Sequence, residues 1–162
     1  MDSLVEVYSE RADNELLAAK SLKRLSENLA SKREFNLPEE ITFYSAVISH
    51  SYYAIFYAAK AILLTKGITT HSPEIHKKTF DEFKKHFVET GILDVKLLEI
   101  YLKMVIRADE LLEIFREEKS KRGKFTYSTI PQANKEPAED SLKNAKTFLY
   151  NISQIIRRIS KK

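Results

Sequence analysis

The segment formed by residues 43–64 constrains the fold more than any other part of the sequence. After Phe43 it reads YSAVISHSYYAIFYAAKAILL, which is apolar or aromatic on nearly every side. A helix without a polar face must be covered on most sides, and its alanines would let neighbouring helices approach closely. His50, Lys60 and several hydroxyl groups interrupt the run, so we expect no membrane span. We interpret the segment as the central helix of a bundle.

The residues before and after this segment predict further helices. Residues 3–33 are expected to form the first helix. Its apolar stripe would consist of Leu4, Val7, Tyr8, Leu22, Leu25 and Leu29. Pro38 suits the first turn of the second helix and Gly67 its end. Ser72 and Pro73 are expected to begin a short third helix, with the serine as its N-cap.

The last two helices complete the predicted architecture. The short helix should end at Gly91, after which Asp94 can cap a fourth helix that runs to Gly123. A polar loop that contains Pro131 follows, and Pro137 is expected to begin the last helix. The sequence therefore predicts an all-α fold in one domain of residues 1–162, an antiparallel bundle of four main helices plus one short helix.

Composition narrows the possible functions. The 162 residues include no cysteine, which excludes disulfides, thiol nucleophiles and thiolate ligands. The N-terminus lacks the pattern of a signal peptide, so we expect a cytoplasmic protein. His71 and His76 lie five positions apart with no carboxylate pair to complete a ligand set, so we expect no metal and no cofactor. The net charge of +4 permits contact with phosphates.

Three stretches together resemble the HEPN family. They are SYYAIFYAAKAILLTKG (residues 51–67), His76 with FDEFKKHFVETGILD (residues 80–94), and REEKSKRGKFTYS (residues 116–128). The resemblance covers roughly residues 42–159. It implies a two-fold dimer, often found beside a minimal nucleotidyltransferase in a toxin–antitoxin pair. It also implies that catalytic members cleave RNA without a metal, using an arginine followed by four to six residues and then a histidine.

This chain departs from that catalytic motif. None of its four histidines has an arginine five to seven positions before it, and Tyr127 follows Arg122 where the histidine should stand. A tyrosine with a pKa of about 10 is a poor general base at neutral pH. The departure argues against the usual ribonuclease chemistry. The resemblance also implies that a partner enzyme could add AMP to a tyrosine here, with Tyr127 as the candidate although the family position corresponds to Thr129.

The predicted ligand site lies around this degenerate motif. Its residues are Arg116, Lys119, Lys121, Arg122, Lys124, Phe125 and Tyr127, whose cations would grip phosphates while the two rings stack on bases. The alternative interpretation is a solvated set of cations at the end of a helix. His50 is either a hydrogen-bonded core group or, with Tyr53 and Tyr57 on neighbouring turns, part of a cleft.

One smaller interpretation and three functions remain open. The acids Asp109, Glu110 and Glu113 are interpreted as surface groups that pair with Arg107 or Arg116. The favoured function is a dimeric nucleotide- or RNA-binding module paired with a nucleotidyltransferase. The second is a metal-independent ribonuclease toxin that would use Arg122, Tyr127 or His50, and the third is a structural interaction domain without a ligand.

Overall fold

The computed structural model describes residues 3–120 and 135–161, with side chains up to residue 113 in the first range. Its elements are α1 (Ser3–Glu27), α2 (Leu29–Glu34), α3 (Tyr44–Leu64), α4 (Ile75–Phe83), the π-helical turn η1 (Lys84–Val88), α5 (Val95–Ser120) and α6 (Lys135–Ser160). These described ranges contain helices and turns and no strand. The all-α prediction is confirmed.

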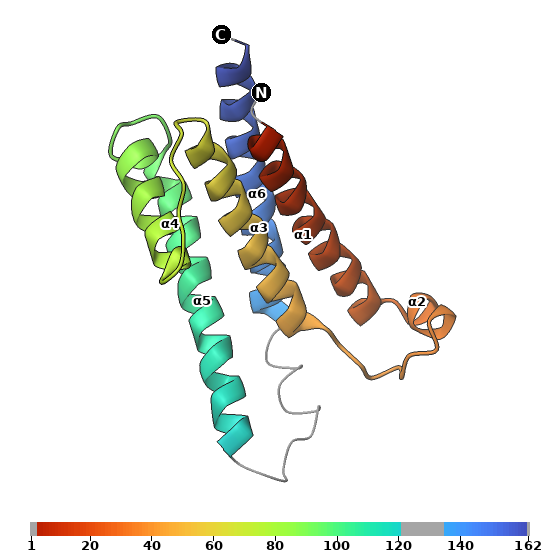
Figure 1. Ribbon diagram of the computed structural model, residues 1–162. Helices are drawn as coiled ribbons and strands as arrows, with labels where there is room; N and C mark the ends of the chain where they lie inside the picture. The colour runs from red at the N-terminus through yellow and green to blue at the C-terminus, as the bar shows by residue number, and fades with distance from the viewer. Residues whose placement is uncertain (1–2, 121–134, 162) are drawn as a thin grey trace.

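The four long helices α1, α3, α5 and α6 lie side by side, and helices that follow one another among them run in opposite directions (Figure 1). The central helix α3 contacts α1, α4, α5 and α6. The short helix α2 projects at the opposite end of the bundle from the two termini (Figure 1). The structure therefore confirms an antiparallel bundle. It also contains a second short helix, α2, besides the one that the sequence predicts.

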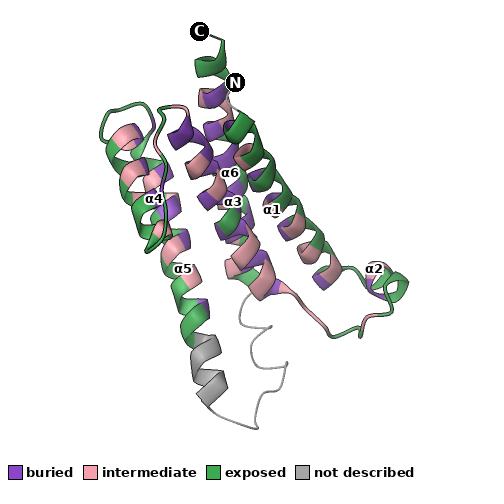
Figure 2. Ribbon diagram, in the orientation of Figure 1, coloured by how far each residue is buried: buried purple, intermediate pink, exposed green. Residues whose placement is uncertain are grey.

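Helix α3 occupies the centre of the bundle, as its lack of a polar face predicts. By length and hydropathy alone it could cross a membrane, but 72% of its most apolar window is buried inside the protein. Ala54, Ala59 and Ala61 are fully buried. Figure 2 shows buried positions gathered on α3 and α6, whereas the outer side of α1 is exposed. The small side chains let α1 and α6 approach the α3 backbone closely.

The first helix buries only part of the stripe that the sequence predicts: Tyr8 and Leu22 are partly buried against the core. Leu4, Val7 and Leu29 are about half exposed, at 50%, 48% and 49%. The buried positions of α1 are Val5, Ala12, Leu16, Ala19 and Ser26. Two alanines on this face fit against the alanine-rich surface of α3, so close packing outweighs the larger apolar area of the leucines.

The first helix is also shorter than the predicted range of residues 3–33. It ends at Glu27, and Asn28 adopts an extended conformation with φ −109° and ψ 110°. The Asn28 side chain accepts a hydrogen bond from the backbone N–H of Ser31 at 2.8 Å and so caps α2. Asparagine competes with the helical backbone in this way, which explains the break.

The central helix begins at Tyr44, so the prediction that it starts at Pro38 was wrong. The backbone N–H of Phe43 donates to the Ser26 hydroxyl of α1 at 2.7 Å. The backbone carbonyl of Glu39 accepts from the ammonium group of Lys32 at 2.5 Å. These contacts with α1 and α2 keep the segment between α2 and α3 out of the α3 helix. The local sequence of that segment does not reveal them.

The short helix α4 begins at Ile75, which corrects the predicted start at Ser72 and Pro73. Glu74 has a φ of +59°, in the left-handed region that a right-handed helix excludes. The other local signals near this helix are confirmed. Gly67 and Gly91 have φ values of +70° and +74° after the helical segments that they end.

The starts of α5 and α6 follow their capping signals with one small difference, whereas the predicted end of α5 at Gly123 lies outside the described residues. The Asp94 carboxylate accepts from the backbone N–H of Lys96 at 2.8 Å, which confirms the predicted cap of α5. Helix α6 begins at Lys135, two residues before the predicted start at Pro137. Proline is still accommodated because the first turn of a helix has no intrahelical acceptor for its N–H.

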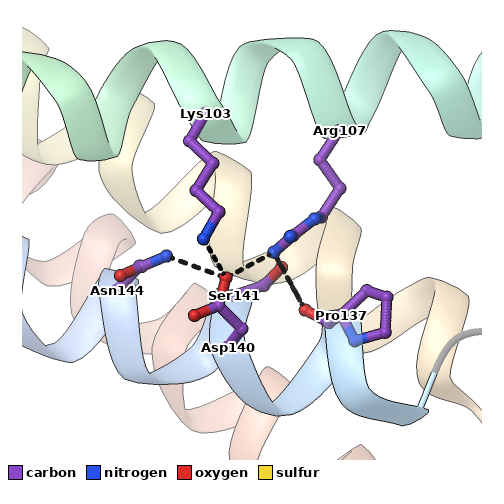
Figure 3. Close-up of polar contacts among 6 residues, drawn as sticks. All are labelled: Lys103, Arg107, Pro137, Asp140, Ser141 and Asn144. Carbon is purple, nitrogen blue, oxygen red and sulfur yellow. Dashed lines mark hydrogen bonds and ion pairs between the residues drawn. The ribbon is translucent and has the colours of Figure 1, made fainter.

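A polar clamp joins α5 to the first turns of α6 (Figure 3). Nη1 of Arg107 donates to the carbonyl of Pro137 at 3.1 Å, to Oδ2 of Asp140 at 3.0 Å and to Oγ of Ser141 at 3.0 Å. Nζ of Lys103 lies 2.7 Å from the same Asp140 oxygen. Burial raises the pKa of Asp140, but hydrogen bonds from Lys103 and Arg107 outweigh it and hold the pKa below its ordinary value. Arg107 thus pairs across helices rather than with an acid of its own helix.

Candidate functional site

Most of the predicted ligand site lies outside the described part of the chain. Five residues of the predicted site lie beyond the described ranges: Lys121, Arg122, Lys124, Phe125 and Tyr127. Arg116 and Lys119 belong to α5, at positions whose side chains are not described. These residues therefore remain predictions from the sequence.

His50 is described, and it forms a pair with a carboxylate of α1. Its Nδ1 atom lies 2.6 Å from Oε2 of Glu15. The side chains of His50 and Glu15 are 37% and 25% exposed, so the pair lies at the edge of the bundle. His50 is hydrogen-bonded but is not a core group, and its Nε2 atom faces away from the bond with Glu15.

A row of four rings crosses the surface from α1 over α3 to α4, and we call it the aromatic seam. Its members are Tyr8, Tyr57, Tyr53 and His76. Tyr8 stacks on Tyr57 at a centroid distance of 6.0 Å, and Tyr57 stacks on Tyr53 at 6.3 Å. His76 meets Tyr53 edge to face at 6.0 Å. Tyr53 is 39% exposed, so the seam offers ring surface to solvent.

Two cations lie against rings of the seam. The guanidinium of Arg11 lies 4.3 Å from the centre of the Tyr57 ring and donates to the Tyr57 hydroxyl at 2.8 Å. The ammonium group of Lys60 lies 4.9 Å from the Tyr8 ring centre. Positive charge beside aromatic faces is the composition of surfaces that bind single-stranded nucleic acids.

A cavity of about 490 Å³ opens where the seam reaches α4 and α5. Its apolar lining comes from Phe80, Val105, Ala108, Leu111 and Leu112. Its main polar lining comes from Tyr52, Tyr53, His76, Lys77 and Asp109. A cavity of about 300–1,000 Å³ with apolar walls and a few convergent polar groups is typical of a small-molecule site.

Tyr52 and His76 form a hydrogen-bonded pair in this cavity. The Tyr52 hydroxyl lies 2.8 Å from Nδ1 of His76. Burial raises the pKa of Tyr52, with Tyr53 and Asp109 adding to the rise, so the phenol is protonated at neutral pH. Desolvation lowers the pKa of His76, as does the charge of Lys60, so the imidazole is neutral. With no other partner among the described residues, the phenol donates to Nδ1, which assigns the imidazole proton to Nε2.

A second phenol lies buried beside the pair. Tyr101 is fully buried, stacks on Phe80 at 5.1 Å, and its hydroxyl has no hydrogen-bond partner within the described ranges. Burial and the neighbouring Tyr52 raise the pKa of Tyr101. Tyr101 packs behind Phe80, which lines the cavity, and does not itself line it.

The sequence indicates only part of this arrangement. Tyr53 and Tyr57 are visible as neighbours on one helix because they are four residues apart. Asp109 is exposed, as its interpretation as a surface acid predicts, and it also lines the cavity, which the sequence does not indicate. His71 is exposed and lies 3.1 Å from the Thr69 hydroxyl, away from this site. No sequence spacing connects His76 to Tyr52 or Asp109, because they belong to three different helices.

Comparison with known proteins identifies the family. Residues 5–155 match the HEPN domain. The chain belongs to the HEPN family. The resemblance that the sequence motifs indicate is thereby confirmed, and it extends over the first helix as well. No solved structure matches this HEPN chain significantly.

Curated relatives share most of the length of this HEPN protein. It is 33% identical over 132 residues to the "Putative toxin MJ0142" of Methanocaldococcus jannaschii, covering 78% of each chain. It is 29% identical over 120 residues to the "Putative toxin MJ0605" of the same organism, covering 74% of this chain and 76% of the relative. A "UPF0332 protein" of Thermotoga maritima is 26% identical over 116 residues, which is 72% of this chain and 75% of the relative.

Proposed function

We propose that this HEPN protein is a dimeric nucleotide- or RNA-binding module that pairs with a minimal nucleotidyltransferase in a toxin–antitoxin-like system. The single observation that carries the binding function is the aromatic seam with its flanking cations Arg11 and Lys60. Stacking on an aromatic ring contributes about 1–3 kcal/mol per base and tolerates any sequence. Two relatives bear the name "Putative toxin", and this supports the proposed class of system.

The exposed face of α5 supports the dimer. Val95, Leu102 and Ile106 recur at intervals of seven and four residues, which places them on one side of the helix. They are 56%, 46% and 51% exposed. Apolar residues at this spacing are the pattern by which two helices pack together, so a second copy would bury them.

Binding to RNA is tested by fluorescence anisotropy with a labelled single-stranded RNA while the salt concentration is raised. We expect binding at low salt that weakens as salt rises, because phosphate contacts release counterions. Tyr53→Ala should weaken the affinity about 5- to 100-fold through lost stacking. The matched control is Tyr150→Ala, which removes a 65% exposed tyrosine from α6, far along the chain from the seam. Equal affinities of the two variants, or no binding at low salt, would refute the proposal.

The second candidate is the metal-independent ribonuclease. The His50–Glu15 pair favours it, since a carboxylate that orients an imidazole is a common arrangement for a general base. Incubation of the protein with cellular RNA and a chelator would show cleavage, which Arg122→Ala and His50→Ala should each abolish. RNA that stays intact would leave binding as the function of the wild-type protein.

The nucleotidyltransferase partner is tested by co-expression. An intact mass increased by AMP on this protein, absent in Tyr127→Phe, would support the pairing. Unmodified protein that also fails to co-purify with such an enzyme would count against it and favour the third function, a structural interaction domain.

A further inference from the structure

We infer that the cavity between α3, α4 and α5 is a base-specific pocket that takes up guanine from unpaired RNA. This inference rests on the proposed RNA binding and adds a base specificity that stacking alone does not provide. Three features carry it: the shape of the cavity, its hydrogen-bonding groups, and its position at the end of the aromatic seam.

The cavity has the walls that a flat base requires. Its volume of about 490 Å³ accommodates a purine together with its sugar. Phe80 of α4 and Leu112 of α5 both line it, and so does Tyr53, which is 39% exposed. A strand stacked along the seam would therefore reach this cavity with its next base.

The polar groups supply one acceptor and one donor. Asp109 lines the cavity and has no salt bridge or hydrogen bond with any described residue, so its carboxylate oxygens are available as acceptors. It lines the same cavity as Tyr52 and His76, and its charge adds to the rise in the pKa of Tyr52. Nδ1 of His76 accepts from Tyr52, which leaves Nε2–H of the ring as a donor.

This pair of groups fits guanine better than the other bases. Guanine carries two adjacent donors, N1–H and the N2 amino group, and a carboxylate can accept from both at once. Its O6 and N7 atoms are acceptors for the imidazole N–H. Adenine, cytosine and uracil each present a single donor group on the pairing edge, so they would leave half of the carboxylate unsatisfied.

A cation at the rim completes the site. Lys77 follows His76 on α4, lines the cavity and is exposed, with no carboxylate partner among the described residues. It can contact the phosphate of the nucleotide whose base is inserted. The pocket would therefore read the base with Asp109 and His76 and hold the backbone with Lys77.

The test compares labelled heptamers that differ at the central base: UUUGUUU, UUUAUUU, UUUCUUU, UUUUUUU and the inosine probe UUUIUUU. We expect the guanine probe to bind at least about tenfold more tightly than the others. Inosine lacks the N2 amino group and should lose most of this advantage. Asp109→Asn should remove the difference between guanine and inosine. The control Glu110→Gln makes the same charge change at the next residue, outside the cavity, and should preserve it.

Each other outcome is decisive. Equal binding of all probes by the wild type would overturn the guanine pocket while the proposed RNA binding stands. A guanine preference that persists unchanged in Asp109→Asn would place base recognition elsewhere and overturn the inference. Absence of binding to every probe at low salt would refute the proposed function itself. A melting temperature of Asp109→Asn equal to that of the wild type would show that this substitution of an exposed residue leaves the fold intact.

Discussion

The α5–α6 clamp offers the sharpest test of the structure, through Arg107→Met. The Arg107 side chain is 19% exposed. The substitution keeps most of its volume and removes the guanidinium. It deletes three hydrogen bonds, one of them to the ionised Asp140. Asp140 retains Lys103, and the Pro137 carbonyl retains a bond from Ser141 at 2.6 Å.

The remaining partners reduce the expected effect. Hydrogen bonds to charged groups contribute about 1.5–3 kcal/mol, but the Asp140 side chain is 35% exposed and solvent screens the pair. We therefore expect the free energy of unfolding to fall by about 2 kcal/mol. For a chain of this size the melting temperature would drop by about 4–8 °C.

Urea denaturation of four proteins measures the interaction directly. The wild type, Arg107→Met, Asp140→Asn and the double variant form a cycle in which we expect a coupling of about 1–2 kcal/mol. The control is Arg33→Met, which breaks the ion pair with Glu39 at 2.7 Å between side chains that are 69% and 59% exposed. Such exposed pairs contribute less than about 1 kcal/mol. An effect of Arg107→Met no larger than that of Arg33→Met, or a coupling of zero, would refute the reasoning.

Three further predictions concern the dimer, the core and the pH dependence of stability. Leu102→Glu should convert the dimer to a monomer in sedimentation velocity, and an unchanged mass would exclude this face as the interface. Phe148→Ala should lower the free energy of unfolding by about 3–5 kcal/mol, because the fully buried ring packs on Phe83 at 5.4 Å and Tyr101 at 5.7 Å. Because the pKa of His76 is lower in the folded protein, the unfolded chain binds a proton to this group at a higher pH. The contribution of His76 to stability is therefore complete above pH about 6.5 and declines as the pH falls toward the folded pKa. His76→Gln should reduce that slope in urea titrations, and a slope equal to that of the wild type would contradict the assignment.

The candidate site shows how far sequence reasoning extends. The spacing of Tyr53 and Tyr57 on one helix indicates a shared face, and this information is local. The seam and its cavity also need α1, α4 and α5, which bring Tyr8, His76 and Asp109 to the same place. Those three residues are separated by long stretches of chain, so no periodicity in the sequence relates them.

The sequence by itself determined the elements whose physical cause is local or overwhelming. A helix with no polar face, α3, could only be buried, and the caps at Asp94, Gly67 and Gly91 depend on residues within one turn. The tertiary structure alone decided where α3 begins, because a hydrogen bond from Phe43 to α1 competes with helical continuation. It also decided which face of α1 is buried and which acid pairs with Arg107. Each of these outcomes depends on contacts between distant segments, and such contacts exist only after the helices have packed.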